Sequence, residues 1–412
     1  MPKHAILSPS GADRWMTCPG SVILSLDIPR TSSAASEEGT NYHDLAALCL
    51  NEGKDAAEFV GQPFADESLV TEENADYLQV YLDQVRELHA QGGHLLVEQS
   101  LPISQITGEK EAIGTIDCAI IREDEVVIDD LKFGRGVAVK AEGNRQTRIY
   151  AISVLDKHEL WETVKRIRII ICQPRVMDGI TEEVLSVDEL KLFRDEVAAT
   201  ARPIIRALAM VPPTPLPFHP SEKACKFCPA KAVCPELTKT VEQATSEGFE
   251  DLTQPVLSRT GEILETPADR LGKAMRLADL CEIFMHGVRV KAESELLAGR
   301  SVTGFKLVQG RKGNRKWTNE ETITEMMKKW RMKKDDMYKY TLITPSVAEK
   351  KLKKEHPSRW EELAALVSQS EGALSVAPVE DPRPEAVLAA ATDGFHDETA
   401  GPSEDELLKD LL

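Results

Sequence analysis

The sequence predicts a mixed α/β (α+β) fold, in which a core sheet is flanked by helices, and three observations support it. Residues 35–91 contain two stretches with apolar side chains at helical spacing. Residues 94–133 contain three short runs rich in β-branched side chains, which is typical of strands. A helical stretch at 144–158 then leads into a strongly apolar run at 166–172. A helix between two strands is the usual connection within a sheet of this class.

The first helices are expected at three places. A short helix begins after the cap-type Ser10 and ends near Cys18, where a proline follows. Residues 35–51 form an amphipathic stretch, and residues 72–91 form another. One face of that last helix collects the apolar side chains of Leu78, Tyr81, Leu82, Val85 and Leu88.

The strands follow at 94–101, 113–121 and 125–133, and the last two are separated by a short charged turn, which suggests a hairpin. The run at 166–172 has no polar face, so we expect a strand that is buried on both sides. Ser186 and Glu189 match a capping box that opens a helix reaching about residue 210.

Composition and charge exclude several classes of protein to which the chain could belong. The chain has 412 residues, of which 42% are hydrophobic and 29% are charged, and its formal net charge is −18. No run approaches the ~20 apolar residues that span a bilayer, and the first residues lack the apolar core of a signal peptide, so we expect a cytoplasmic protein without membrane contact. The overall charge argues against a uniformly cationic coat for nucleic acid.

The charge is unevenly distributed. Residues 306–354 hold fifteen basic and six acidic side chains, and residues 377–412 hold ten acidic and two basic ones. We therefore predict four parts: a core at 1–240, a helical connector at 241–300, a helical or α+β basic module at 301–376 and a disordered acidic tail at 377–412.

Two carboxylates and a lysine are the principal candidates for chemistry. Asp117 and Asp130 lie on the two strands of the expected hairpin, and Lys132 shares a strand face with Asp130 because side chains alternate along a strand. Two carboxylates held together favour a divalent cation with oxygen ligands. The alternative is an exposed hairpin with ordinary charges, but the apolar residues around these positions make unpartnered charges costly there.

Two further motifs flank this hairpin. Gln146 and Tyr150 are four residues apart and share one face of the 144–158 helix. His43 lies on the 35–51 helix, four residues after Gly39. Taken alone, the Gln146/Tyr150 pair is better explained by a packing tyrosine beside a solvated glutamine, and a lone helical histidine such as His43 is more often structural than a metal ligand.

The cysteines form a separate signal. Cys225, Cys228 and Cys234 lie close together in the sequence, and such a cluster indicates a zinc ion or an iron–sulfur centre. Isolated cysteines at other positions are expected to pack as small apolar side chains.

Together these motifs resemble the RecB-like branch of the PD-(D/E)XK nuclease superfamily. That family orders a GxxxH helix, a GxxD strand, a (D/E)xK strand and a QxxxY helix, which correspond here to Gly39/His43, Gly114/Asp117, Asp130/Lys132 and Gln146/Tyr150. Glu98, on the preceding strand, matches an acidic position often seen there. The resemblance covers about residues 1–240, and the whole chain resembles phage-borne RecB-like nucleases with a C-terminal extension.

The resemblance implies a restriction-endonuclease-like core and a DNA nuclease that hydrolyses phosphodiester bonds. The enzyme would process DNA ends in phage recombination or replication as an exonuclease. By this resemblance Mg²⁺ or Mn²⁺ would be held by His43, Asp117, Asp130 and the carbonyl of Leu131. The catalytic set would be completed by Lys132, Gln146, Tyr150 and Glu98.

A subset of these nucleases, including AddB-type and CRISPR-adaptation nucleases, carries a [4Fe–4S] cluster. The resemblance makes Cys18 the first ligand, with Cys225, Cys228 and Cys234 as the others. Such a cluster would staple the N-terminus to the end of the core. Structural Zn²⁺ held by the same four thiolates is the alternative.

The remaining predictions concern DNA and partners. In the basic module, cationic side chains are interleaved with an aromatic one, a pattern that can follow a phosphate backbone and stack on bases; they are Arg311, Lys312, Arg315, Lys316 and Trp317. Arg175 is a further candidate phosphate contact, and an ordinary surface arginine is the equally weighted alternative. The acidic tail could bind a single-strand-binding or recombination protein. A processive exonuclease could also form a ring-shaped homo-oligomer.

Two other functions fit parts of the same sequence. One is a non-catalytic DNA-binding or assembly protein on a nuclease scaffold, and the other is an end-trimming nuclease of the CRISPR-adaptation type. The complete Asp117, Asp130 and Lys132 set argues against the first, because a binding module needs no buried metal ligands. The long C-terminal extension argues against a minimal form of the second.

Overall fold

The structure is a computed structural model. It describes residues 5–29, 34–135, 138–247, 254–306, 308, 325, 328–329, 353 and 357–364. By its internal contacts the chain divides into two units, Met1–Gln309 and Gly310–Leu412. The second unit contributes helix α14 (Pro357–Ala364) to the described residues. The predicted acidic tail lies outside them, and the predicted boundaries at 240, 300 and 376 stay predictions.

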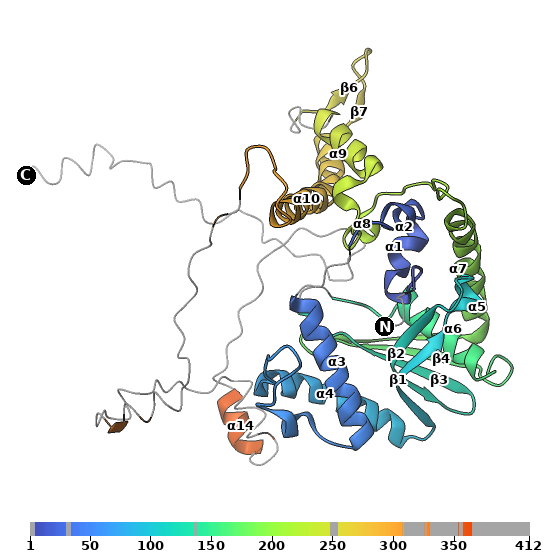
Figure 1. Cartoon of the computed structure of the whole chain (residues 1–412), viewed down its shortest axis with the longest axis vertical. Helices are drawn as coiled ribbons and strands as arrows, with labels where there is room; N and C mark the ends of the chain where they lie inside the picture. The colour runs from blue at the N-terminus through green and yellow to red at the C-terminus, as the bar shows by residue number, and fades with distance from the viewer. Residues whose placement is uncertain are drawn as a thin grey trace, which may run out of the picture. The chain divides into compact units, whose positions relative to one another are not determined.

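A five-stranded mixed sheet forms the centre of the first unit (Figure 1), in the order β1-β2-β3-β4-β5. Its strands are β1 (His94–Pro102), β2 (Ile113–Ile121), β3 (Glu125–Leu131), β4 (Arg166–Cys172) and β5 (Ile180–Ser186). Neighbours are antiparallel except β3 and β4, which are parallel and joined through helix α6 (Arg145–Lys157). A parallel pair needs such a crossover, and the predicted mixed α/β class is confirmed.

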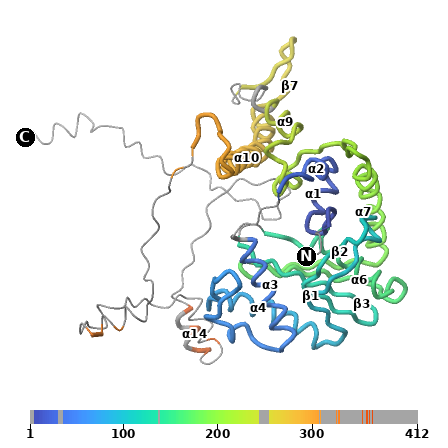
Figure 2. The backbone as a smooth tube through the Cα atoms, in the orientation of Figure 1, coloured from blue at the N-terminus to red at the C-terminus, as the bar shows by residue number. Residues whose placement is uncertain are grey.

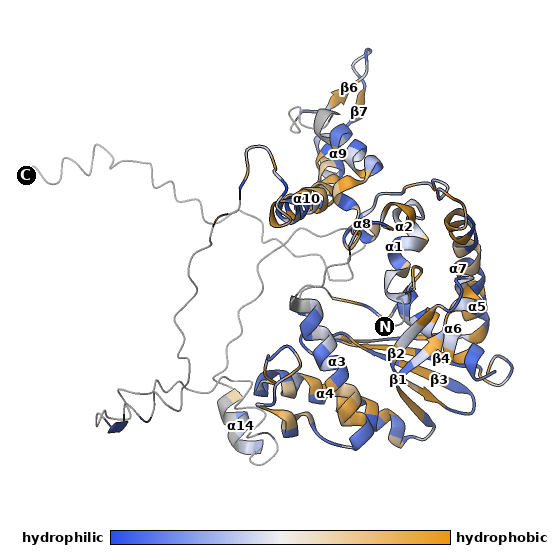
Figure 3. Cartoon of the chain, in the orientation of Figure 1, coloured by the Kyte–Doolittle hydropathy of each residue, from blue (hydrophilic) through white to orange (hydrophobic). Residues whose placement is uncertain are grey.

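Helices cover both faces of the sheet. One face packs against α3 (Ala34–Glu52) and α4 (Glu72–Ala90), and the other packs against α6 and α7 (Val187–Leu208). Figure 3 shows apolar residues on the sheet and on the helix sides that meet it. Strand β4 is buried along most of its length, as the sequence predicts for a strand covered on both faces.

The remaining described elements are short except α9 and α10. They are η1 (Pro9–Gly11), α1 (Ala12–Thr17), α2 (Gly20–Leu24), η2 (Ala56–Phe59), α5 (Ser104–Thr107), α8 (Glu222–Cys225), η3 (Lys231–Val233), α9 (Pro235–Glu247), β6 (Val256–Leu257), β7 (Ile263–Glu265) and α10 (Pro267–Leu297). None of the helices in the described part of the chain has the length and hydrophobicity needed to cross a membrane.

Local side-chain bonds fix the beginnings of the main helices. Thr71 caps α4 by accepting from the Asn74 amide, and Asn144 caps α6 in the same way. Ser186 and Glu189 form the predicted capping box at the start of α7, with both reciprocal hydrogen bonds present. These caps supply partners for amides that a helix leaves unpaired at its N-terminus.

Strand alternation reverses on β2 at Asp117. Ile116 packs with Ile128 in the cluster beneath α6 and α7, but Cys118, two residues later, packs with Val127 beneath α3 and α4. In a regular strand two such residues share one face. The reversal therefore places the Asp117 side chain where the strand crosses from one face to the other.

The structure differs from the sequence prediction at two places. Strand β5 was not predicted, because its apolar Ile180 and Val184 are 50% and 56% exposed while its inward positions are partly polar. A short hairpin, β6 with β7, precedes α10 in a region that the sequence predicts to be mostly helical. There the turn residues around Gly261, whose φ is +85°, interrupt the helical pattern.

Candidate active site

The β2–β3 hairpin brings the two predicted carboxylates to the same end of the sheet. Its register pairs Cys118 with Asp129, and one further step places Asp117 opposite Asp130. The Leu131 amide donates a hydrogen bond of 2.8 Å to the Asp117 carboxylate, which fixes that side chain against β3. The sequence expectation that a hairpin would bring these acids together agrees with this register.

His43 reaches the same point from α3. Its Nδ1 lies 3.1 Å from Oδ1 of Asp117, and the imidazole is one-quarter exposed. Burial acts to lower the pKa of His43, but the hydrogen bond and negative charge of Asp117 outweigh it and raise the pKa. One carboxylate therefore joins a helix on one face of the sheet to the end of strand β3.

Glu98 completes this group from strand β1. The register of β1 with β2 places Glu98 opposite Asp117, and its backbone takes a left-handed conformation with φ of 45°, which is rare for a residue with a side chain. Ligand atoms of His43, Glu98 and Asp117 all lie within 4.8 Å of one another. Burial, followed by the charge of Asp117, raises the pKa of Glu98 to about 7.

This group has the chemistry of a divalent-cation site. Two carboxylates and one imidazole are donors that suit Mn²⁺, and the carboxylates suit Mg²⁺. The raised pKa of Glu98 reflects first its burial and then the negative charge of Asp117, and a cation bound there would offset the cost of the second negative charge. The residues present therefore fit a divalent ion.

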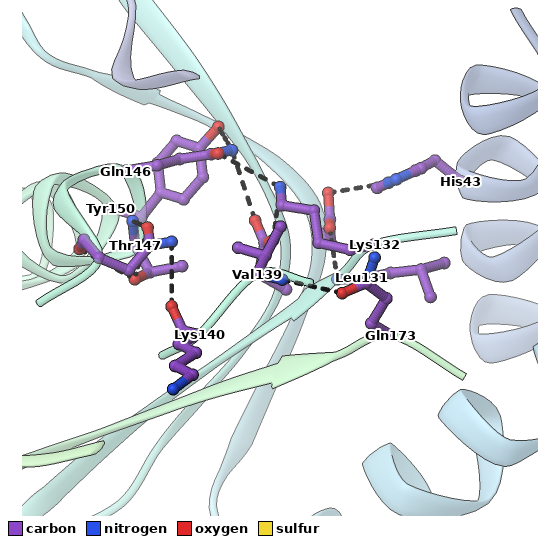
Figure 4. A network of polar contacts seen from close by, with 12 residues as sticks. His43, Leu131, Lys132, Val139, Lys140, Gln146, Thr147, Tyr150 and Gln173 are labelled. Carbon is purple, nitrogen blue, oxygen red and sulfur yellow. Dashed lines mark hydrogen bonds and ion pairs between the residues drawn. The ribbon is translucent and has the colours of Figure 1, made fainter. Parts of the chain in front are cut away.

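A second group lies on the neighbouring strand β3 and on α6. The Lys132 ammonium lies 2.6 Å from Oδ2 of Asp130 and donates to Oε1 of Gln146 at 3.2 Å. The side-chain nitrogen Nε2 of Gln146 lies 3.4 Å from Oδ1 of Asp130 and 3.1 Å from the Tyr150 hydroxyl. Figure 4 shows Gln146 and Tyr150 on one side of Lys132, and His43 on a helix on the other side.

Lys132 is held as a cation at this position. Burial acts to lower the pKa of Lys132, but the negative charges of Asp130 and Asp117 outweigh it and raise the pKa. Its side chain is 25% exposed, whereas that of Asp130 is 2% exposed. Lys132 is therefore the partly accessible member of the pair, and Asp130 is its enclosed member.

The two motif glycines differ in their surroundings. A Cβ atom on Gly114 would lie 3.0 Å from Pro9 and 3.2 Å from the Tyr150 ring, so glycine lets β2 pass close beneath Tyr150. A Cβ on Gly39 would meet nothing within 4 Å. Steric contact explains why position 114 is a glycine. No contact among the described residues explains the glycine at position 39.

The four candidate cluster ligands come together from distant parts of the chain. After α7 the chain crosses back to α1 and α2 (Figure 2), where the Gly20 amide bonds to the Pro217 carbonyl at 2.9 Å. Cys18, Cys225, Cys228 and Cys234 are 5–8% exposed. Burial raises the pKa of Cys225 to about 11, and the other three thiols interact with it electrostatically.

Arg175 does not lie where its predicted phosphate contact requires. Its side chain is 4% exposed and forms an ion pair of 3.0 Å with Glu38. Because the guanidinium is enclosed and already paired, we correct this prediction and assign Arg175 to the interior of the fold. The five predicted DNA contacts between Arg311 and Trp317 lie outside the described residues.

Three residues in the site region were missed by sequence reasoning. Glu38 and Gln173 bond to groups near the site, and Asp129 is a second fully buried acid on β3. Glu38 directly precedes Gly39, Gln173 lies two residues before Arg175, and Asp129 directly precedes Asp130, so each lies beside a predicted site residue in the sequence. Their partners depend on long-range packing that spacing alone does not contain.

The fold and the site define a mixed α/β protein with acids, a histidine and a lysine gathered at one end of its sheet. The chain belongs to the family described as "Protein of unknown function (DUF2800)", whose model matches residues 4–384.

Two solved structures are similar to parts of the chain. One is a crystal structure named "Putative exonuclease" from Eubacterium rectale, at 15% sequence identity and a TM-score of 0.30, covering 48% of this chain and 80% of that one. The other is the crystal structure of SSO0001, at 13% identity and a TM-score of 0.22, covering 52% of this chain and 94% of that one.

Proposed function

We propose that this protein is a metal-dependent deoxyribonuclease. The observation that carries the proposal is the placement of two groups at one end of the sheet. His43, Glu98 and Asp117 form a set of cation ligands, and the Asp130–Lys132 ion pair lies on the adjoining strand. A hydrolytic site for phosphodiesters needs both a cation and a positioned proton-handling or anion-stabilising group.

The first group would hold Mg²⁺ or Mn²⁺, with Asp130 and the Leu131 carbonyl as the further ligands implied by the family resemblance. A divalent ion bound there would polarise the phosphate and lower the pKa of a water molecule. Asp117 accepts from the Leu131 amide through one oxygen and faces His43 through the other, so its orientation is fixed before any ion binds. Such preorganisation lowers the reorganisation that catalysis requires.

Lys132 would act on the reacting phosphate or on the attacking water. It is positively charged and partly exposed, and Asp130 and Gln146 set its direction. Tyr150 in turn fixes Gln146 through its hydroxyl. Burial raises the pKa of Tyr150, so the phenol stays neutral and hydrogen-bonds as a hydroxyl group.

DNA is the substrate that this proposal names, and processing of DNA ends as an exonuclease is its finer form. The support for DNA is the family resemblance of residues 1–240 together with the basic segment 306–354, which carries fifteen cationic side chains. The same resemblance supports a place in phage recombination or replication.

We further propose a [4Fe–4S] cluster held by Cys18, Cys225, Cys228 and Cys234. The support is the burial of four thiols from opposite ends of the core, and a hydrogen bond of 3.3 Å from the His219 amide to the Cys18 sulfur. Hydrogen bonds to ligand sulfurs are common at such clusters. Anaerobically prepared protein should absorb near ~400 nm and contain iron and sulfide. Stoichiometric zinc without iron would refute the cluster.

The test of the nuclease proposal is a digestion series on end-labelled linear, nicked and single-stranded DNA, with Mg²⁺, with Mn²⁺ and with chelator. We expect metal-dependent cleavage of linear DNA from its ends by the full-length protein. Asp130→Ala and Lys132→Ala should abolish cleavage while each variant keeps its circular dichroism spectrum and a cooperative unfolding transition.

Three outcomes would change the account. Undiminished hydrolysis by both folded variants would refute the site. Cleavage of the nicked DNA at internal positions, away from its ends and from the nick, would identify the protein as an endonuclease and not an exonuclease. DNA binding without cleavage under any metal condition would favour the binding or assembly protein.

A further inference from the structure

The segment that follows β4, Gln173-Pro174-Arg175, contacts the chain on both sides of the candidate site. It leaves the sheet beside Lys132, whose amide bonds to the Cys172 carbonyl at 2.8 Å and so extends the β3–β4 ladder by one residue. The two polar side chains of this segment are nearly enclosed and have defined partners. None of the roles proposed above uses them.

Gln173 bonds to two points of the connection between β3 and α6. Its side-chain oxygen accepts from the Val139 amide at 3.0 Å, and its side-chain nitrogen donates to the Gly134 carbonyl at 3.1 Å. The residue is 2% exposed, and Figure 4 shows its bond to Val139. A buried side-chain amide that uses both its donor and its acceptor in this way fixes Gly134 and Val139 relative to the end of β4.

Arg175 joins the residue after Lys132 to helix α3. Its Nη1 donates to the Phe133 carbonyl at 3.1 Å, and its guanidinium lies 4.8 Å from the centre of the Phe133 ring. The same guanidinium forms the ion pair with Glu38, on α3. Arginine suits this position because it is planar, permanently charged and able to stack while it donates.

Aromatic packing continues this connection to the cation ligands. The ring of Phe133 stacks on that of Tyr42 with centroids 4.1 Å apart and planes 13° from parallel. Phe133 directly follows Lys132, and Tyr42 directly precedes His43. Glu38 and Tyr42 are four residues apart on α3 and therefore share a helix face.

We propose that Gln173 and Arg175 are positioning residues of the candidate site. They hold α3 and the segment after Lys132 in the arrangement in which His43 and Glu98 share a cation with Asp117. This inference rests on the proposed cation site, which it extends to residues that touch no ligand. The His43–Asp117 contact crosses from a helix to the sheet, so it depends on the distance between those two elements, and the Arg175–Phe133–Tyr42 packing spans that distance.

A role in stability alone is the competing explanation, and the two explanations differ in what they predict for metal affinity. Loss of packing lowers the melting temperature and leaves the affinity of each folded molecule unchanged. Loss of positioning weakens metal binding in molecules that are still folded. Residues that orient metal ligands typically change metal affinity or activity by about 10- to 100-fold when they are replaced.

The experiment measures Mn²⁺ binding to the full-length protein by isothermal titration calorimetry at a temperature where every variant is folded. The test variants are Arg175→Lys and Glu38→Gln. Their matched controls are Arg168→Lys and Glu182→Gln, which alter a similar ion pair of 2.7 Å between β4 and β5. We expect Mn²⁺ affinity to fall about tenfold in the test variants and to stay within about twofold of wild type in the controls.

A Gln173→Ala variant adds a measurement that is independent of metal and of activity. Hydrogen exchange at the Val139 amide should accelerate by about tenfold or more in this variant, since the side-chain oxygen that accepts its hydrogen bond is removed. Unchanged exchange would overturn the role of Gln173, and unchanged Mn²⁺ affinity in folded Arg175→Lys and Glu38→Gln would overturn that of Arg175.

These readouts separate the inference from the nuclease proposal. If the wild type binds Mn²⁺ and the test variants bind it more weakly, the positioning role stands even when no DNA is cleaved. If the wild type cleaves DNA and the test variants match it in Mn²⁺ affinity and in the Mn²⁺ concentration for half-maximal rate, the nuclease stands and the positioning role falls. A wild type that binds no Mn²⁺ overturns both.

Discussion

Asp129 and Asp130 are consecutive acids on β3, both nearly inaccessible at 1% and 2% exposure, yet they lie in opposite environments. Asp130 faces α6, where it has the Lys132 cation at 2.6 Å and the Gln146 amide at 3.4 Å. Asp129 faces α4, where Gln84 donates to one oxygen at 2.8 Å. Among the described residues the other Asp129 oxygen has no hydrogen-bond partner.

Consecutive residues of one strand point to opposite faces of the sheet, so two aspartates side by side can have different roles. The face toward α6 adjoins Asp117, Gln146 and a partly exposed lysine, so a negative charge there has a cationic partner, although burial still raises the pKa of Asp130. The face toward α4 is apolar, and burial raises the pKa of Asp129 to about 8. We therefore expect Asp130 to serve chemistry and Asp129 to be carried as a neutral acid in the core.

The largest effect is expected from removing the cation beside Asp130. Lys132→Met keeps the length of the apolar side chain and removes the ammonium, and it should slow DNA cleavage by at least about 100- to 1,000-fold. Single-turnover cleavage of end-labelled DNA measures the rate, and Mn²⁺ titration of the same sample checks that the ligands remain. A rate within threefold of wild type would contradict the assigned role.

A matched pair of glutamines tests the comparison next. Gln146→Met removes the amide that contacts Asp130, and Gln84→Met removes the one that bonds Asp129. The first should lower the cleavage rate by about 10- to 100-fold. The second should lower the free energy of unfolding by about 1–3 kcal/mol, because it leaves a buried acid without its donor, and should leave the rate unchanged. Equal effects of the two substitutions on the cleavage rate would show that Asp129 and Asp130 do not differ in role.

The titration of Asp129 makes a third prediction. An unfolded aspartate loses its proton near pH 4, whereas folded Asp129 keeps its proton up to about 8. Between these values the folded state binds the extra proton, so stability falls as pH rises, by about 1.4 kcal/mol per pH unit for one such group.

Asp129→Asn removes this contribution, so its stability should depend less steeply on pH than that of wild type between pH 4 and pH 8. Urea unfolding at pH 5, 6, 7 and 8 measures both curves. Parallel curves for variant and wild type would show that Asp129 is ionised in the folded core.

The smallest effect concerns the two motif glycines. Gly114→Ala places a methyl group 3.0 Å from Pro9 and 3.2 Å from Tyr150, and overpacking of this kind costs about 1–3 kcal/mol. Gly39→Ala meets nothing within 4 Å and lies in a helix, so it should stabilise the protein by about 0.5–1 kcal/mol. Thermal unfolding of both variants measures the difference, and a destabilised Gly39→Ala would show that the helix is crowded there.

Much of the core was predictable because the signals are local. Periodicity located β2, β3, β4, α4 and α6, and the Ser186–Glu189 pair located the start of α7. The hairpin register and the strand period were enough to bring Asp117 near Asp130 and to place Lys132 beside it. Helical spacing was enough to put Gln146 and Tyr150 on one face.

What could not be predicted depends on tertiary contacts. Strand β5 lacks the usual pattern because its inward Thr181 and Glu183 accept hydrogen bonds from amides preceding α6, so polar residues take the place of apolar ones. The left-handed backbone of Glu98 and the reversal of alternation at Asp117 have no signature in the sequence. Arg175 resembles a surface cation until Glu38 and Phe133 are folded around it.

The most direct test of the central claim compares Asp130→Asn with Asp129→Asn in Mn²⁺-dependent cleavage of end-labelled linear duplex DNA. The two substitutions are chemically identical and one residue apart. We expect folded Asp130→Asn to lose cleavage by about 100-fold or more, and Asp129→Asn to keep a rate within about threefold of wild type. Equal loss in both variants, or full activity in Asp130→Asn, would contradict this expectation.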